Sequence, residues 1–130
     1  MKKIILSVPS VFLAWSVMDY IIHGMILSSS YAATASLWRP MGEMKMGVMY
    51  LAVLIAAIAF VAIFAQFFSK KGIITGLKYG LWFGIAAGVP MGYGSYSVMP
   101  IPYHMALTWC LGSISEAVIG GLIVGAFIRE

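Results

Sequence analysis

The amino-acid sequence predicts an all-α membrane protein, built as one bundle of four transmembrane helices. Of its 130 residues, 62% are hydrophobic and only 9% are charged, whereas a soluble domain carries roughly 25% charged residues. The apolar residues form four long runs, and a helix needs about 20 such residues to cross the hydrocarbon core. We expect helices rather than strands, because an open strand edge in lipid leaves backbone groups unpaired.

The four runs predict spans joined by short connections into a single membrane-embedded domain, at about residues 4–27, 47–68, 73–92 and 104–128. The first run follows Lys2 and Lys3 and imitates a signal peptide. It is longer than the 7–15 apolar residues, roughly, of a signal-peptide core, so we expect it to be retained. The second run is rich in alanine, and the last two are rich in glycine.

The distribution of Lys and Arg predicts the orientation of the spans. Six basic residues fall at the two termini and around the connection between spans two and three: Lys2, Lys3, Lys70, Lys71, Lys78 and Arg129. The opposite side carries only Arg39 and Lys45. Because loops rich in Lys and Arg stay in the cytoplasm, both termini are predicted to be cytoplasmic.

Glycines recur at every fourth residue of the third span, at Gly76, Gly80, Gly84, Gly88 and Gly92. The fourth span has a matching pair, Gly121 and Gly125. Residues four apart share one face of a helix, and small residues there let two helix backbones approach closely in lipid. The pattern indicates helix packing inside the bundle, and part of it could instead meet another subunit.

Three ionisable residues fall deep within the predicted spans. Asp19 and His23 are four residues apart and share one face of the first span, and Glu116 lies in the fourth. Helical rise places Asp19 and Glu116 at similar depths. Charged groups at that depth are costly and face protein or water by default. The residues form either a polar cluster that fixes helix register or a site that shares protons or binds a cation.

Methionines are concentrated in the predicted outer half, where Met41, Met44 and Met46 lie close together and His104 precedes Met105. Thioethers and imidazoles suit Cu(I), but methionine is also an adaptable apolar filler. These residues are therefore weak candidates for a copper site, and we expect no cofactor. The sequence contains no enzyme signature such as a phosphate loop or nucleophile elbow. The basic residues lie at the ends of apolar runs, so no nucleic-acid partner is expected.

One segment resembles a known group. The pattern Asp19-x-x-x-His23-Gly24, then Tyr31, then "LWRPMGEM" at 37–44 is similar to small bacterial four-span membrane proteins of unknown function. The resemblance covers roughly residues 15–50 and implies a multi-pass protein of the bacterial inner membrane. It implies no activity or ligand. Within this segment, we expect Pro40 to lie in the first turn of the second span, where proline is tolerated.

Two functions are consistent with these features. The favoured one is a non-catalytic accessory or structural subunit, which works by helix packing in a larger membrane assembly or a homo-oligomer. The alternative is a small proton- or cation-coupled transporter or channel that uses Asp19, His23 and Glu116. Copper is one candidate for the cation. The two differ in whether the carboxylates line a water-accessible cavity or are sealed among side chains.

Overall fold

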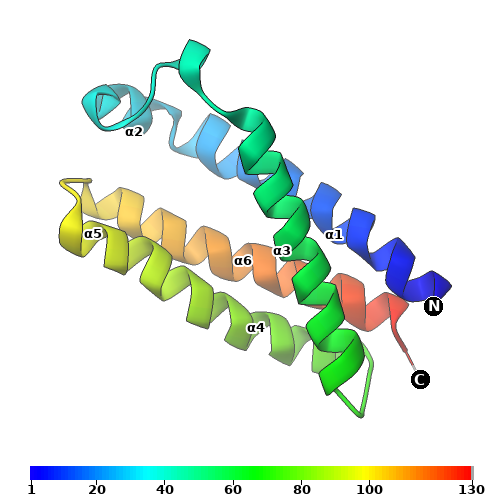
Figure 1. Ribbon diagram of the computed structural model, residues 1–130. Helices are drawn as coiled ribbons and strands as arrows, with labels where there is room; N and C mark the ends of the chain where they lie inside the picture. Colours follow the sequence, from blue (N-terminus) through cyan, green and yellow to red (C-terminus); the bar gives the residue numbers. More distant parts are fainter. Residues whose placement is uncertain (130) are drawn as a thin grey trace.

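The computed structural model describes residues 1–129, and all of the regular structure in this part of the chain is helical. Figure 1 shows long helices that run side by side or cross, with the short helix α2 at the end of the bundle opposite the two termini. In chain order the elements are α1 (Lys2–Asp19), the π-helical η1 (Tyr20–Ile26), α2 (Ser28–Ala33), the 3₁₀ turns η2 (Ala35–Leu37) and η3 (Met41–Glu43), α3 (Met46–Phe67), α4 (Ile73–Val89), the π-helical η4 (Pro90–Gly94), α5 (Ser95–Val98) and α6 (Tyr103–Phe127). The predicted all-α class is confirmed.

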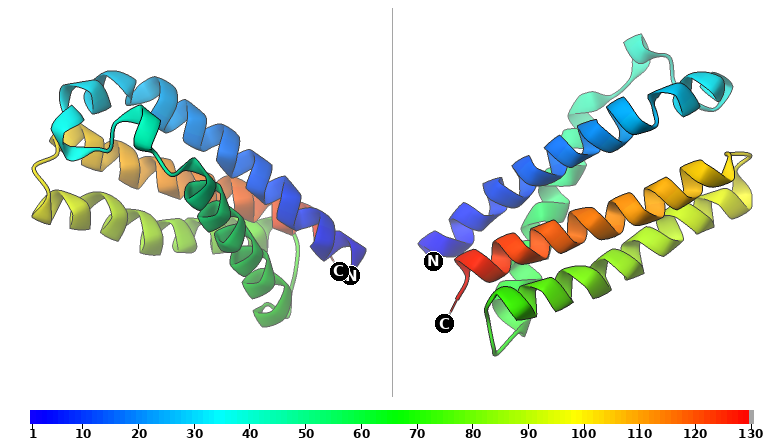
Figure 2. Two further views of the ribbon diagram at one scale, coloured as in Figure 1. Left: turned by 45° about the horizontal axis from the view of Figure 1, so that its top comes forward. Right: turned by 180° about the vertical axis from the view of Figure 1, so that it is seen from behind.

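Four continuous helical stretches are long and apolar enough to cross a membrane, namely Lys2–Ile26, Met46–Phe67, Ile73–Val98 and Tyr103–Phe127. The chain is therefore a multi-pass membrane protein with a four-helix bundle. The two termini lie at one end of this bundle, together with the connection between α3 and α4 (Figures 1 and 2). This is the arrangement that a common cytoplasmic side for the basic residues requires.

The third span is longer than predicted. Its end was expected at Gly92, but the helix continues through η4 and α5 to Val98. Pro90 would normally break a helix, because it has no N–H and its ring clashes with the preceding turn. Here the wider π-helical turn Pro90–Gly94 begins at that proline. Such turns can accommodate an interrupted hydrogen-bond ladder within a membrane helix.

The start of the second span differs from the expectation for Pro40. That residue adopts φ −54° and ψ 149° and precedes the short turn η3, whereas α3 begins only at Met46 with Lys45 as its N-cap. Pro40 therefore does not open the membrane helix. Its polyproline-like backbone instead connects the two separate turns η2 and η3.

The glycines of α4 lie directly against α6. A Cβ atom added to Gly76 or Gly80 would collide with the backbone carbonyl oxygen of Gly121 or Ala117, respectively. Gly84, Gly88 and Gly92 face Ile114, Cys110 and Ala106 in the same way, and Gly125 faces Gly72. One Cα hydrogen of each glycine thus points at the facing backbone, the geometry of weak Cα–H···O contacts. Glycine spacing brings these two helices together along their whole length.

Two apolar clusters complete the packing. The inner cluster joins α1, α3 and α4 around the fully buried Phe60 and Phe64, where Trp15 and Tyr79 stack edge-on or tilted against Phe60. The Tyr79 hydroxyl donates to the Phe60 carbonyl at 2.9 Å. The outer cluster surrounds the buried Met105 on α6. The inner cluster therefore holds α3 mainly through the half that lies nearer the two chain termini.

The outer half of α3 stands away from the bundle. Figure 1 shows this helix crossing the others obliquely. Residues 46–52 are all exposed, and the first buried residue of α3 is Ala57. The single chain therefore leaves more than a turn of apolar helix without a buried residue.

Candidate functional site

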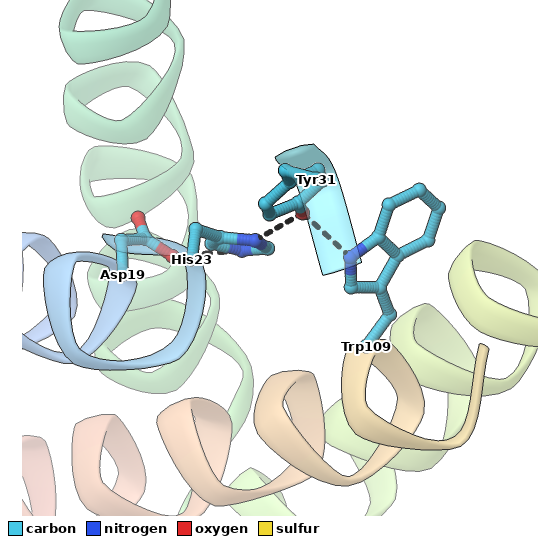
Figure 3. A network of polar contacts seen from close by, with 4 residues as sticks. All are labelled: Asp19, His23, Tyr31 and Trp109. Carbon is cyan, nitrogen blue, oxygen red and sulfur yellow. Dashed lines mark hydrogen bonds and ion pairs between the residues drawn. The ribbon is translucent and has the colours of Figure 1, made fainter. Parts of the chain in front are cut away.

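The structure brings the three ionisable residues of the spans to one place. Asp19 ends α1, His23 lies in the π-helical segment that follows, and Glu116 lies midway along α6. Tyr31 on α2 and Trp109 on α6 reach the same place from the outer side, as Figure 3 shows. The consecutive elements α1, η1 and α2 and the distant helix α6 thus supply one polar cluster, which we call the Asp19–Glu116 site.

A directed chain of hydrogen bonds enters this site. The indole of Trp109 can only donate, and its Nε1 lies 2.8 Å from the Tyr31 hydroxyl oxygen. Tyr31 in turn lies 2.6 Å from Nδ1 of His23. Tyr31 can donate to a bare Nδ1 or accept from Nδ1–H, depending on the tautomer of His23. The other ring nitrogen of His23 is Nε2. That nitrogen faces Asp19, with 3.9 Å between Nε2 and Oδ1.

Tyr31 lies outside the spans, and its surroundings favour the protonated form of its hydroxyl group. Burial raises the pKa of its phenol, an effect that the hydrogen bond from Trp109 partly offsets. A raised pKa means that the hydroxyl holds its proton at and above neutral pH. Tyr31 is therefore a hydrogen-bond donor over the physiological range.

The carboxyl groups of Asp19 and Glu116 meet within hydrogen-bonding reach of each other. An ionised carboxylate has no hydrogen to donate, so a bond between the two groups requires one proton that the pair shares. Glu116 Oε1 is fully buried and has no protein hydrogen-bond partner. The site therefore has a carboxyl oxygen available to a further donor.

A small cavity of about 10 Å³ lies at this point. Its polar lining comes from His23, Ser113 and Glu116, and Trp109 and Met91 supply part of the apolar lining. A space of this size accommodates roughly one water molecule when polar partners surround it. Glu116 therefore faces a cavity with room for a single water.

The segment Ser28–Trp38 covers the outer side of the site. Besides Tyr31, it is held by Ser30, whose hydroxyl lies 2.6 Å from Nε2 of His104. Trp38 packs edge-on against the rings of Tyr31 and Trp109 at centroid distances of 5.3 Å and 5.9 Å. The short helix α2 thus forms a cap, and its contacts are aromatic and polar rather than a continuous apolar core.

The candidate copper ligands do not converge on one point. Met105 is fully buried in the outer apolar cluster, whereas the neighbouring His104 is exposed and contacts Ser30. Met41, Met44 and Met46 are exposed, Met41 to 87%. No group of three or more His, Cys, Asp or Glu side chains within residues 1–129 is arranged to hold a metal ion. Copper binding at these residues therefore stays a prediction.

Sequence reasoning did not assign Trp109 or Trp15 to the site. Trp15 donates from Nε1 to the backbone carbonyl of Glu116 at 2.7 Å, which supports α6 at the height of the carboxyl pair. In the sequence, Tyr31 stood out only as part of the resemblance. A tryptophan in an apolar run carries no local signal of its partner, so only the tertiary structure could identify these contacts.

Comparison of the chain with protein-family models, with curated proteins and with solved structures gave no match. The resemblance of residues 15–50 to bacterial four-span proteins therefore stays a prediction.

Proposed function

We propose that this protein is a non-catalytic subunit of a membrane assembly in the bacterial inner membrane, either a homo-oligomer or a complex with another membrane chain. The observation that carries the proposal is the free outer half of α3. Residues 46–52 are all exposed, although the inner half of the same helix is held by buried aromatic residues. A second membrane helix would provide the missing packing.

The exposed surface of α3 is suited to such a helix. Ala52, Ala56 and Ala59 are all exposed, and their spacing of four and three residues places them on one face. Small residues at this spacing permit close approach of a neighbouring helix. The glycines of α4, in contrast, are occupied by α6. The alanine face of α3 is therefore the better candidate for contact with a partner.

The polar site gives independent support. The side chains of Asp19 and His23 retain 29% and 39% of their exposure in the single chain. Ionisable groups inside a membrane normally face protein or water rather than lipid. A partner that packs beside α3 could shield them from lipid while leaving the outer side wet.

The test is the oligomeric state of the protein purified in a mild detergent, with identification of any chains that co-purify. We expect a particle larger than one chain, and we expect Ala56→Leu to shift it towards the monomer. Ile58→Leu is the matched control, because Ile58 is exposed on another face of α3. A wild-type protein that is monomeric and free of partners would refute the proposal.

A second function is favoured by a separate observation. The hydrogen-bond chain from Trp109 through Tyr31 to His23 ends beside two carboxyl groups and a water-sized cavity. We therefore keep as the alternative a small proton- or cation-coupled transporter or channel, completed by oligomerisation. Asp19→Asn should then abolish ion-dependent or pH-dependent flux in liposomes while leaving assembly intact.

A further inference from the structure

We propose that the Asp19–Glu116 site binds a single proton from the outer side of the membrane, and that the segment Ser28–Trp38 is a lid that controls its exchange. This inference deepens the transport alternative, because it names the ion and its side of entry. It does not require flux, since a proton site can equally regulate an assembly. Three features of the molecule support it, namely the neighbouring carboxyl groups, the cavity beside Glu116 and the contacts of the lid.

The first step concerns the ion. The cavity of about 10 Å³ has room for one water, whereas Ca²⁺ takes six to eight oxygen ligands. Two carboxyl groups, one imidazole and one hydroxyl surround the cavity or adjoin it. A hydrogen bond between the neighbouring carboxyl groups of Asp19 and Glu116 needs one hydrogen between them. A shared proton therefore satisfies the geometry without any further ligand.

The second step concerns the route. When Tyr31 releases Nδ1 of His23, a hydronium ion in the outer water can protonate Nδ1 and leave as water. The imidazolium then passes its Nε2 proton to the Asp19 carboxylate. The products are a neutral imidazole with its proton on Nδ1 and one proton on the carboxyl pair. Release follows the same steps in reverse, so protons and charge balance without an additional reactant.

The third step concerns the lid. The contact of 2.6 Å between the Tyr31 hydroxyl and His23 Nδ1 is compatible with both neutral tautomers of His23, because a phenol oxygen can donate to bare Nδ1 or accept from Nδ1–H. The donor Trp109 stays attached to Tyr31 in either state, since indole cannot accept. Tyr31 thus closes the outer entrance and holds His23 in a fixed orientation. Opening the lid requires loss of these bonds together with the contact between Ser30 and His104.

The titratable groups at the site come from α2, from α6 and from the continuous helix that α1 and η1 form. They are Asp19 from α1, His23 from η1, which continues the same helix, Glu116 from α6 and Tyr31 from α2. The η4 segment adjoins the cavity through Met91 and contributes no ionisable side chain to its lining. Exchange should therefore depend on His23 and Tyr31, while the bound proton should depend on the two carboxyl groups.

Infrared spectroscopy of the full-length protein in lipid nanodiscs tests the proposal. A carboxyl group that carries a proton has its own C=O band, which shifts when the proton is replaced by deuterium. We expect this band near neutral pH in the wild type and expect its loss in Glu116→Gln. Asp19→Asn is a second variant, which keeps the test decisive if the first fails to fold. Helix content by circular dichroism identifies folded variants.

The lid is tested by the rate at which this band shifts after transfer to D₂O. Tyr31→Phe removes the bonds to His23 and Trp109 and should accelerate the shift about tenfold, equivalent to about 1.4 kcal/mol. Tyr96→Phe is the matched control, because Tyr96 is exposed at the same end of the bundle. Absence of the band, or equal exchange rates in the wild type and Tyr31→Phe, would overturn the proposal. A normal band and lid effect without flux would reject only the transport alternative.

Discussion

One methyl group added at Gly80 should weaken the protein, although the same change in another helix should not. An alanine Cβ at Gly80 would lie 2.9 Å from the backbone carbon of Ala117 and 2.9 Å from Cα of Val118, and closer still to the Ala117 carbonyl oxygen. All three neighbours are backbone atoms, so no side chain can rotate away and α4 must move from α6. Overpacking of this kind costs about 1–3 kcal/mol.

The gain in helix propensity from glycine to alanine offsets up to about 1 kcal/mol of this cost. Gly80→Ala should therefore lower the free energy of unfolding by about 1–2 kcal/mol. Gly47→Ala is the control, because Gly47 lies in α3 with no atom within 4 Å of the added Cβ. It should leave stability unchanged or raise it. Unfolding in mixed detergent micelles, followed by circular dichroism, measures both, and equal effects would refute the packing argument.

Three further predictions concern the bundle. Trp15→Phe should cost about 0.5–1.5 kcal/mol through loss of its bond to the Glu116 carbonyl, whereas Trp82→Phe should be nearly silent because Trp82 is 69% exposed. Tyr79→Phe should cost a similar amount through loss of its bond to Phe60, measured in the same unfolding assay. Reporter fusions after the C-terminus and near residue 35 should report opposite sides of the membrane, and a shared side would contradict the predicted topology.

The sequence alone was sufficient for the number of spans and for most of their limits. Each span must be apolar along its whole length and must pair its own backbone groups, so the hydropathy of each segment by itself predicts whether it crosses the membrane. The limits of the first and fourth spans differ from the expectation by no more than two residues at either end. The third span was predicted too short, because Pro90 and the glycines around it read as a helix end. The π-helical turn that carries the helix past Pro90 has no comparable signature in the residue pattern.

The candidate site could be predicted only in part. Asp19, His23 and Glu116 stood out because ionisable residues are rare in apolar runs, and the cost of burial argued for a common location. Their cap could not be foreseen. Tyr31 and Trp109 are 78 residues apart, and Trp15 and Glu116 are 101 apart. Whether such pairs meet depends on how the helices cross and on the π-helical turn after Asp19, which orients His23 and is followed directly by α2.

Hydrophobicity and glycine spacing in the sequence by themselves determined that this chain forms four membrane helices and that α4 carries a face of small residues. Only the tertiary structure decided that α6 occupies that face, that the outer half of α3 is left free, and that α2 folds back over the carboxyl pair. The physical reason is that the stability of each helix in lipid depends mainly on the hydrophobicity of its own residues. Helix partners and hydrogen-bonded caps are instead selected by shape and by polar groups that become neighbours only after folding.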